Sequence, residues 1–390
     1  MALGGVVLAL VLLLTGAIVG GGRELGLGAM AGYVLPGEVA SVQATWAVPR
    51  IQADSPAGVA GTWIGAQAPG APGPFIQIGT NEECFAPPPG GGLPAQLREP
   101  QLGVSGGALT DPVQDGGQCL GSGRPTSNTQ YFAFWADTRD GFHPQRLFGV
   151  LPGDEVSAGL SLGQGRWRLT LLDRTSGRSA RFSTAEEAHA SFNLAEWLQE
   201  DVVDGATGAP FPYPTLTPVR FRDVEVNAAP PSSSMLDSQW LSAEGRSYGP
   251  GPLDGNAFTI SRRTVSTLGA QYLRIAAGED AATHVFVPGM DGWSPSTPRE
   301  RIAEERGAFA RSLRENIRAL SDGRWPRAVQ DLIRTLVRRT GALLLHVQSA
   351  PGMTSAGIEG WTQTWGREAF ELGLAGRAIR QRLQLPTYGH

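Results

Sequence analysis

Hydrophobic and polar residues alternate along most of the chain up to about residue 287. The segments RWRLTLLD (166–173) and VRFRDVEV (219–226) show the pattern clearly. Alternation with period two places one set of side chains in a core and the other in water, as in a half-buried β-strand. The predicted strands cover 42–48, 60–66, 74–79, 130–137, 154–161, 166–173, 179–183, 217–226, 257–262, 271–275 and 284–287. Short strands at regular spacing, joined by turn residues, predict an antiparallel β-sandwich.

The pattern changes near Trp293, where apolar residues begin to recur at helical spacing. The first predicted helix follows Pro298, the second covers about 326–346, and the third covers about 358–383. Such helices form a small antiparallel helical domain. The sequence therefore predicts a mainly β protein with a C-terminal α-helical domain, divided into 1–31, a sandwich at 42–290 and helices at 296–385, with 23–40 as a linker.

The N-terminal segment is apolar and carries no charged side chain before Arg23. Its length is near the roughly 20 residues that span a bilayer. It also ends near Ala29-Met30-Ala31, which has the small residues of a signal-peptide cleavage site. A cleaved signal peptide and a retained membrane anchor both fit. We therefore expect a secreted or cell-surface protein, anchored in the membrane if the segment is kept.

The amino-acid composition limits the partners and the kinds of catalytic site that we expect. The formal net charge is -4, which gives no reason to expect nucleic acid as a partner. All basic residues are arginine, so no lysine can act as a Schiff-base nucleophile. Two cysteines and five histidines show none of the spacings of a metal site, and no Ser/His/Asp arrangement stands out. We expect no metal and no cofactor.

The two cysteines are Cys84 and Cys119. In an exported chain they could form one disulfide within the sandwich. Free buried thiols are the alternative. We predict the disulfide.

A polar side chain, Gln77, interrupts an apolar strand in the segment PFIQIG (74–79). A side-chain amide is costly to bury unless it finds partners, although a glutamine on the wet face of a sheet would also fit. Four other segments accompany it, in this order: VQATWAVPR (42–50), YFAFWADTRD (131–140), NLAEWLQED (193–201) and PFPYPTLTPVRFRDVEV (210–226).

Taken together and in this order, these segments resemble the glutamic peptidases, or eqolisins, from Val42 to Ile260. NLAEWLQED is the most specific match. The resemblance implies a concanavalin A-like sandwich that hydrolyses peptide bonds. In that family a Glu acts as base and then as acid, while a Gln amide binds the oxyanion. Gln77 matches the Gln.

The position that the resemblance gives to the Glu is held by Ala136, and Asp137 follows it. Because side chains alternate along a strand, Asp137 should point to the face opposite Ala136. Only a β-bulge would turn the Asp137 side chain to the face that carries Ala136. The candidate catalytic residues are therefore Gln77 and Asp137, with Asp137 conditional on such a bulge.

Other carboxylates stay open as bases, namely Glu82, Glu83, Glu196 and Asp201, although the last two fit a structural role in their segment. The candidate substrate-binding residues are aromatic side chains that could line a cleft or fill the core, namely Trp46, Trp63, Phe132 and Phe134.

The prediction for function is an exported glutamic-peptidase-like protein, a monomer with weak or altered acid endopeptidase activity on protein or peptide substrates. The alternative is an inactive sandwich that binds peptide or glycan. A surface-anchored structural protein, whose helices meet a partner, is a third reading. Fold alone does not decide among the three.

Overall fold

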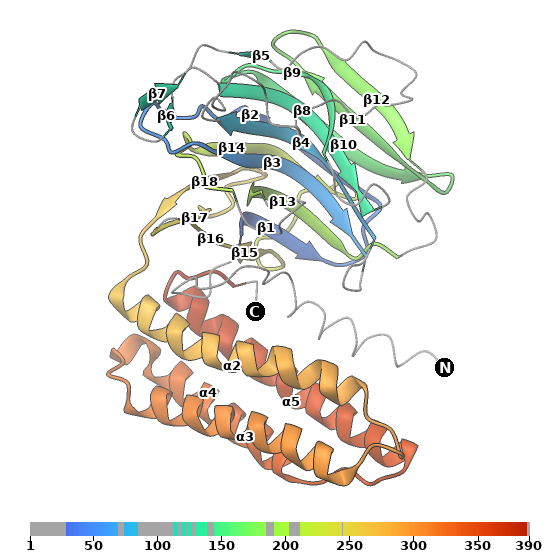
Figure 1. Cartoon of the computed structure of the whole chain (residues 1–390), viewed down its shortest axis with the longest axis vertical. Helices are drawn as coiled ribbons and strands as arrows, with labels where there is room; N and C mark the ends of the chain where they lie inside the picture. Colours follow the sequence, from blue (N-terminus) through green and yellow to red (C-terminus); the bar gives the residue numbers. More distant parts are fainter. Residues whose placement is uncertain are drawn as a thin grey trace. The chain divides into compact units, whose positions relative to one another are not determined.

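The computed structural model (Figure 1) describes residues 29–68, 74–84, 113–114, 119–121, 124–126, 129–138, 144–184, 191–202, 211–243 and 245–387. The described chain forms two compact units that meet in sequence between Arg263 and Thr264. The first unit is built of strands and the second of helices. The change therefore comes earlier in the chain than the predicted boundary between 290 and 296.

Two antiparallel sheets make up the β unit. The first sheet has the order β15-β1-β13-β3-β4-β8-β5, with β9 also paired to β8. Its strands are β1 (Met30–Pro36), β3 (Gly58–Gln67), β4 (Phe75–Cys84), β5 (Val113–Gln114), β8 (Thr129–Asp137), β9 (Gln145–Gly149), β13 (Leu194–Asp201) and β15 (Asp237–Gln239).

The second sheet has the order β12-β11-β10-β2-β14-β18-β17-β16. Its strands are β2 (Ser41–Ala47), β10 (Glu155–Gly163), β11 (Arg166–Asp173), β12 (Ser179–Thr184), β14 (Val219–Val226), β16 (Leu241–Ala243), β17 (Arg246–Pro250) and β18 (Phe258–Arg263). A small pair, β6 (Cys119–Gly121) and β7 (Arg124–Thr126), forms a separate ribbon.

The two sheets pack as a sandwich around an aromatic core. Trp46, Trp167, Trp197 and Phe221 are fully buried in one apolar cluster. In β11 the burial alternates along the strand, so one face meets the core and the other meets water. In β4 and β8 every residue is buried, which means that both faces of the first sheet are covered there. The predicted mainly β sandwich with C-terminal helices is confirmed.

Most of the predicted strands are confirmed, from 42–48 to 257–262. The strands predicted at 271–275 and 284–287 are wrong, because both segments belong to one helix, α2 (Thr267–Asp291). Ser266 Oγ caps this helix by accepting a hydrogen bond from the Gly269 amide at 3.0 Å. The linker predicted at 23–40 is wrong in its second half, where β1 pairs with both β13 and β15.

The helical unit contains α2, α3 (Arg299–Asp322), α4 (Arg327–Gln348) and α5 (Ser355–Arg382), so the three predicted helices are present and α2 is added. Aromatic rings fill its interior. Phe286 stacks on Phe309 with ring centroids 4.5 Å apart, and Trp361 and Trp365 pack against the same ring.

In the part of the chain that the structure describes, no helix has the length and apolar character needed to cross a membrane. Residues 1–28, with the predicted signal peptide or anchor, lie outside the described residues.

The separate cores of the two units predict that the sandwich folds without the helices. A chain that ends at Arg263 should keep a cooperative thermal melt and β-type circular dichroism, because the sandwich core is formed by residues before that point. A chain that ends at Val219, which loses most of β14 and all of β15, β16, β17 and β18, is the control and should not fold. Loss of both signals in the chain ending at Arg263 would show that the helices complete the sandwich core.

Candidate functional site

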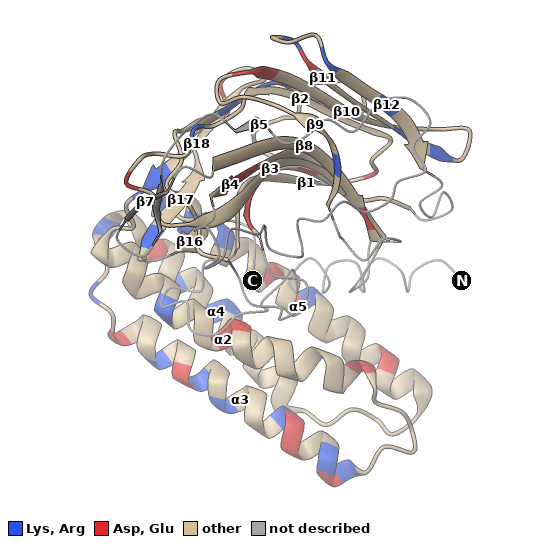
Figure 2. Ribbon diagram, turned by 45° about the horizontal axis from the view of Figure 1, so that its top comes forward, with Lys and Arg blue, Asp and Glu red and all other residues tan. Residues whose placement is uncertain are grey.

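The candidate site lies on the outer face of the first sheet, the face directed away from the second sheet. Ile76 and Ile78 of β4 point into the core, so Gln77 between them points to the outer face. Figure 2 shows that the first sheet curves, with this outer face on its concave side. We use "outer face" for this surface of β13, β3, β4, β8 and β9.

Strand register brings four positions into one row across the outer face. Glu196 pairs with Gly65, Gly65 pairs with Gln77, and Gln77 pairs with Ala136. Glu196 and Gln77 are thus two strands apart, which is about 10 Å between their Cα atoms at the usual strand spacing. A glycine lies between the two long polar side chains, and the Trp63 ring and the Glu196 carboxylate fill the space above it.

The Glu196 carboxylate leans over that glycine. A Cβ atom placed on Gly65 would lie 3.1 Å from Glu196 Oε2. Gln77 and Glu196 are both buried, with 7% and 4% of their surface exposed. Among the described residues, neither Gln77 Oε1 nor Glu196 Oε2 has a hydrogen-bond partner. Two buried polar atoms without hydrogen bonds on the two sides of one glycine are a costly arrangement, which a bound polar group would relieve.

The electrostatics of the row favour a neutral Glu196. Burial raises the pKa of Glu196 to about 8, and the neighbouring charge of Glu200 raises it further in the same direction. Burial also raises the pKa of Glu200 to about 7, against the opposing effect of a hydrogen bond from Trp63. A carboxyl group with its pKa near neutrality can both accept and return a proton, as general acid–base catalysis requires.

Trp63 organises the middle of this face. Its indole Nε1 donates to Glu200 Oε2 at 2.9 Å. The Trp63 ring lies over Gly65, since a Cβ atom added to that glycine would be 2.7 Å from the ring. The Cβ atom of Trp63 lies against Gly79, since a Cβ atom added to Gly79 would be 2.5 Å from it. Two glycines therefore make room for one tryptophan that holds a carboxylate beside Glu196.

The structure brings three of the four predicted aromatic residues to the outer face. Trp63 lies on β3, and Phe132 and Phe134 share the face of β8 that carries Ala136. Trp46 does not join them. It lies in the core between the sheets, and its Nε1 donates to Thr80 Oγ1 at 3.2 Å.

Asp137 is not brought to Gln77. Strands β4 and β8 pair without a register shift, so Asp137 sits opposite Ile76 while Ala136 sits opposite Gln77. Asp137 is 1% exposed and accepts a hydrogen bond from Thr184 Oγ1 at 3.1 Å. The bulge that would turn it outward is absent between these two described strands, so its side chain stays on the inner face.

The carboxylates that follow Gln77 in sequence are divided between the two faces of β4. Glu82 points inward and accepts hydrogen bonds from Thr80 at 2.8 Å and from Thr62 at 3.2 Å. Burial raises its pKa well above the ordinary value. Glu83 points to the outer face, where burial raises its pKa to about 7.

Sequence reasoning did not assign Glu196 to the site. Its segment NLAEWLQED was the best-matching one, and that match is the signal that could have found it. Glu200 belongs to the same segment but was not named as a candidate base, although two glutamates four residues apart in a strand face the same side.

The predicted disulfide stays a prediction. Cys84 is fully buried at the end of β4. Cys119 begins β6, and its side chain lies outside the described residues.

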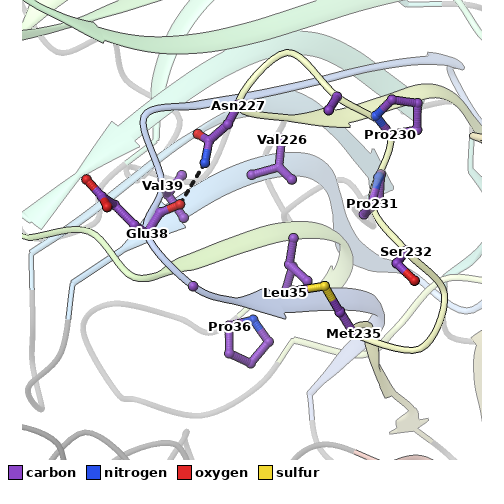
Figure 3. Close-up of a pocket in the computed structure, with 12 residues that line it drawn as sticks. Leu35, Pro36, Glu38, Val39, Val226, Asn227, Pro230, Pro231, Ser232 and Met235 are labelled. Carbon is purple, nitrogen blue, oxygen red and sulfur yellow. Dashed lines mark hydrogen bonds between the residues drawn. The ribbon is translucent and has the colours of Figure 1, made fainter.

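A surface pocket of about 290 Å³ lies at the end of β1 and does not include the row (Figure 3). Its polar centre is Asn227, whose amide donates to the Glu38 carbonyl at 2.8 Å and accepts from the Ala40 and Ser41 amides. These bonds tie the turn after β1 to the turn after β14. The polar groups of this pocket therefore serve the fold.

The comparisons with known proteins give distant similarities. No family model matches this chain, and no curated protein matches it. Among solved structures, scytalido-glutamic peptidase with a transition state analog inhibitor is 16% identical, covers 60% of this chain and 98% of its own, and has a TM-score of 0.42. SCP-B, an eqolisin-family peptidase in complex with the tripeptide Ala-Ile-His, has the same identity and coverage and a TM-score of 0.40.

Tailspike protein 2 of bacteriophage CBA120 is more distant, at 10% identity and a TM-score of 0.21, covering 54% of this chain and 27% of its own. The first structural neighbours are thus eqolisin-family glutamic peptidases. The likeness is too low to assign a function by itself.

The raised pKa values predict a sandwich that is more stable in acid. Folding raises the pKa of Glu196 to about 8 and those of Glu83 and Glu200 to about 7, from an ordinary value of 4.5. The folded state therefore holds protons that the unfolded chain releases, and this stability is lost as the pH rises from about 4.5 through 7 to 8. Urea unfolding of the chain ending at Arg263 should show a free energy of unfolding that falls over this range.

The double variant Glu196→Gln/Glu200→Gln should flatten this dependence, because it removes two of the responsible groups. Glu225→Gln, an exposed carboxylate bonded to Gln43 on the second sheet, is the matched control and should leave the dependence unchanged. A free energy of unfolding that is higher at pH 8 than at pH 5 would contradict the assignment.

Proposed function

We propose that this chain is a peptidase in which Glu196 and Gln77 form the reacting pair. The observation that carries the proposal is the row Glu196–Gly65–Gln77, with an unbonded buried oxygen on each polar side chain and a glycine between them. The row has the two groups that peptide hydrolysis without a covalent nucleophile needs, namely a proton acceptor and an oxyanion donor, on the strands either side of Gly65.

The chemistry follows from the two side chains. A peptide carbonyl bound beside Gln77 and Glu196 would be attacked by a water whose proton passes to the Glu196 carboxylate. The developing oxyanion would accept a hydrogen bond from the Gln77 amide nitrogen. A half-turn of the terminal amide exchanges its oxygen and its nitrogen, so the same position can present N–H donors. Glu196 then returns the proton to the leaving amine, and the C–N bond breaks.

Ala136 has a different place in this proposal from the one first expected. It lies next to Gln77 in the row, on the side away from Glu196. Ala136 is completely buried there and carries no group that could act as a base. Because Glu196 supplies a carboxylate in the same row, Ala136 does not leave the row without a base.

The setting of the activity follows from the N-terminal segment. Export through that segment would bring the peptidase to protein or peptide substrates outside the cell. This part of the proposal rests on the sequence.

Substitution of either member of the pair should remove cleavage of an unfolded protein substrate. Glu196→Gln should lower kcat/KM by about 10²–10⁴-fold, because the proton acceptor is lost. Gln77→Ala should lower it by about 10²–10³-fold, because an oxyanion donor is lost. Initial rates, followed by mass spectrometry of the products, measure both effects.

Asp137→Asn is the matched control for this experiment. Asp137 is a buried carboxylate on a neighbouring strand whose side chain faces inward and is bonded to Thr184. Its replacement should leave kcat/KM unchanged. Activity that survives in Glu196→Gln but disappears in Asp137→Asn would overturn the proposed pair, provided both variants keep the wild-type melt.

The charge of Glu200 predicts the pH profile. Glu200 raises the pKa of Glu196, so Glu200→Gln should lower that pKa and move the acidic limb of kcat/KM to lower pH. The glutamine oxygen can still accept the hydrogen bond from Trp63, which keeps the ring in place. A pH–rate profile from pH 3 to 9, compared with wild type, measures the shift. An unchanged acidic limb would mean that Glu196 does not control the rate.

A further inference from the structure

We propose that Arg146, at the rim of the outer face, binds an acidic side chain of the peptide substrate some residues away from the cleaved bond. This inference rests on the proposed function and adds a specificity site to it. The site consists of Arg146, Phe132, Phe134, Glu83 and Gln130, and we call it the rim site.

The register of three strands places the rim site on the same face as Gln77. Arg146 pairs with Phe134, and Phe134 lies two residues before Ala136 on β8. Paired residues in a sheet point to the same side, so Arg146 joins the outer face. Glu83 of β4 pairs with Gln130 of β8 and completes the group.

The Arg146 guanidinium lies over the ring of Phe132. Its Cζ lies 4.2 Å from the centroid of the Phe132 ring. A cation–π contact of this kind uses the face of the group and leaves its N–H donors for hydrogen bonds with a carboxylate. The stacked geometry therefore suits a planar carboxylate that approaches from the side.

The guanidinium has an unused donor. Among the described residues, Arg146 Nη2 is buried and has no hydrogen-bond partner. The Glu83 carboxylate lies 3.7 Å away, too far for a hydrogen bond, and its Oε2 is also unbonded. Arg146 keeps 17% of its side chain exposed, while Glu83 keeps 5%. A buried cation with a free donor is a site that a second carboxylate can complete.

Glu83, the carboxylate that lies 3.7 Å from Arg146, carries little negative charge below neutral pH. Burial raises the pKa of Glu83 to about 7, and the Arg146 charge opposes that rise. Below neutral pH Glu83 is therefore mostly protonated. The Arg146 charge is then left without a full counter-charge inside the sheet face, which favours an anion from the substrate.

The distance from the row sets the substrate position. The Phe132 ring under the guanidinium lies four residues from Ala136, which is about 13 Å along a strand. An extended peptide advances about 3.3–3.6 Å per residue. A substrate that follows β8 would thus place its third to fifth residue from the cleaved bond over the rim site. An Asp or Glu side chain there could meet Arg146 Nη2 while its methylene groups contact Phe134.

The test uses matched peptides in the full-length protein. Each peptide carries Glu or Gln at the third, fourth or fifth residue on either side of one cleaved bond. We expect wild type to prefer Glu at one of these positions by on the order of tenfold in kcat/KM, the effect of one charge-assisted hydrogen bond. Arg146→Met should abolish this preference and leave cleavage of the Gln peptides unchanged.

Two further variants serve as a control for Arg146→Met and as a replacement for it if it does not fold. Arg168→Met removes an exposed arginine of β11 in the second sheet and should retain the preference. Glu83→Gln/Arg146→Met removes both charges of the pair, so it tests the same point if Arg146→Met alone is too unstable. A preference that persists without Arg146, or no preference at any of these positions in wild type, overturns the inference.

Failure of the proposed function would look different. In that case wild type would cleave neither Glu nor Gln peptides. Binding of the same labelled peptides, followed by fluorescence anisotropy, would then decide the inference. Tighter binding of a Glu peptide, lost in Arg146→Met, supports the rim site, and equal binding of Glu and Gln peptides rejects it.

Discussion

The outer face depends on the missing side chain of Gly65. This glycine lies between Glu196 and Gln77 in the row, and its bare Cα leaves room for the Glu196 carboxylate and the Trp63 ring. A single methyl group there would meet the ring at 2.7 Å and the Ile76 carbonyl at 3.2 Å. Sheet backbone cannot move away without losing its ladder, so the clash could not be relieved cheaply. The place of the Trp63 ring and the Glu196 carboxylate over the middle strand thus depends on one residue of that strand.

The buried polar groups around Gly65 lower the stability of the fold. Burial penalises the charged form of Glu196 and Glu200, and no described residue satisfies Glu196 Oε2. A purely structural sheet would gain stability from apolar residues at these positions. Unsatisfied buried groups in an otherwise well-packed sheet are typical of functional sites, where the fold tolerates a local cost. The aromatic core between the sheets, with Trp46 and Trp197, supplies the packing that offsets it.

The two faces of β8 have different roles. Tyr131 and Trp135 of the inner face pack in the core, and Asp137 is bonded there to Thr184. Phe132 and Phe134 of the outer face lie between the row and Arg146. The same alternation that directs one carboxylate inward thus directs two aromatic side chains to the face that carries Gln77. Rate and specificity would then be set on one face, while the opposite face holds the sheets together.

The sequence by itself determined most strand positions and the C-terminal helices, and it showed that Gln77 is a polar residue within an apolar strand. These follow from local periodicity, since one face of each amphipathic strand or helix must leave water. Some predictions from the sequence were wrong. Strands were predicted within α2, because this helix contains Tyr, Val and Phe residues that are typical of strands, and β13 was not predicted. Nearly all of β13 is buried, on both faces, so its polar and apolar residues show no simple alternation.

Only the tertiary structure decided which carboxylate faces Gln77. Glu196 reaches the row because β13 pairs with β3, although well over a hundred residues separate it from Gln77 in the sequence. Asp137, close to the row in sequence, is turned away because β4 and β8 pair without a bulge. Register is fixed by the packing of both sheets around their shared core, and a local pattern holds no information on it.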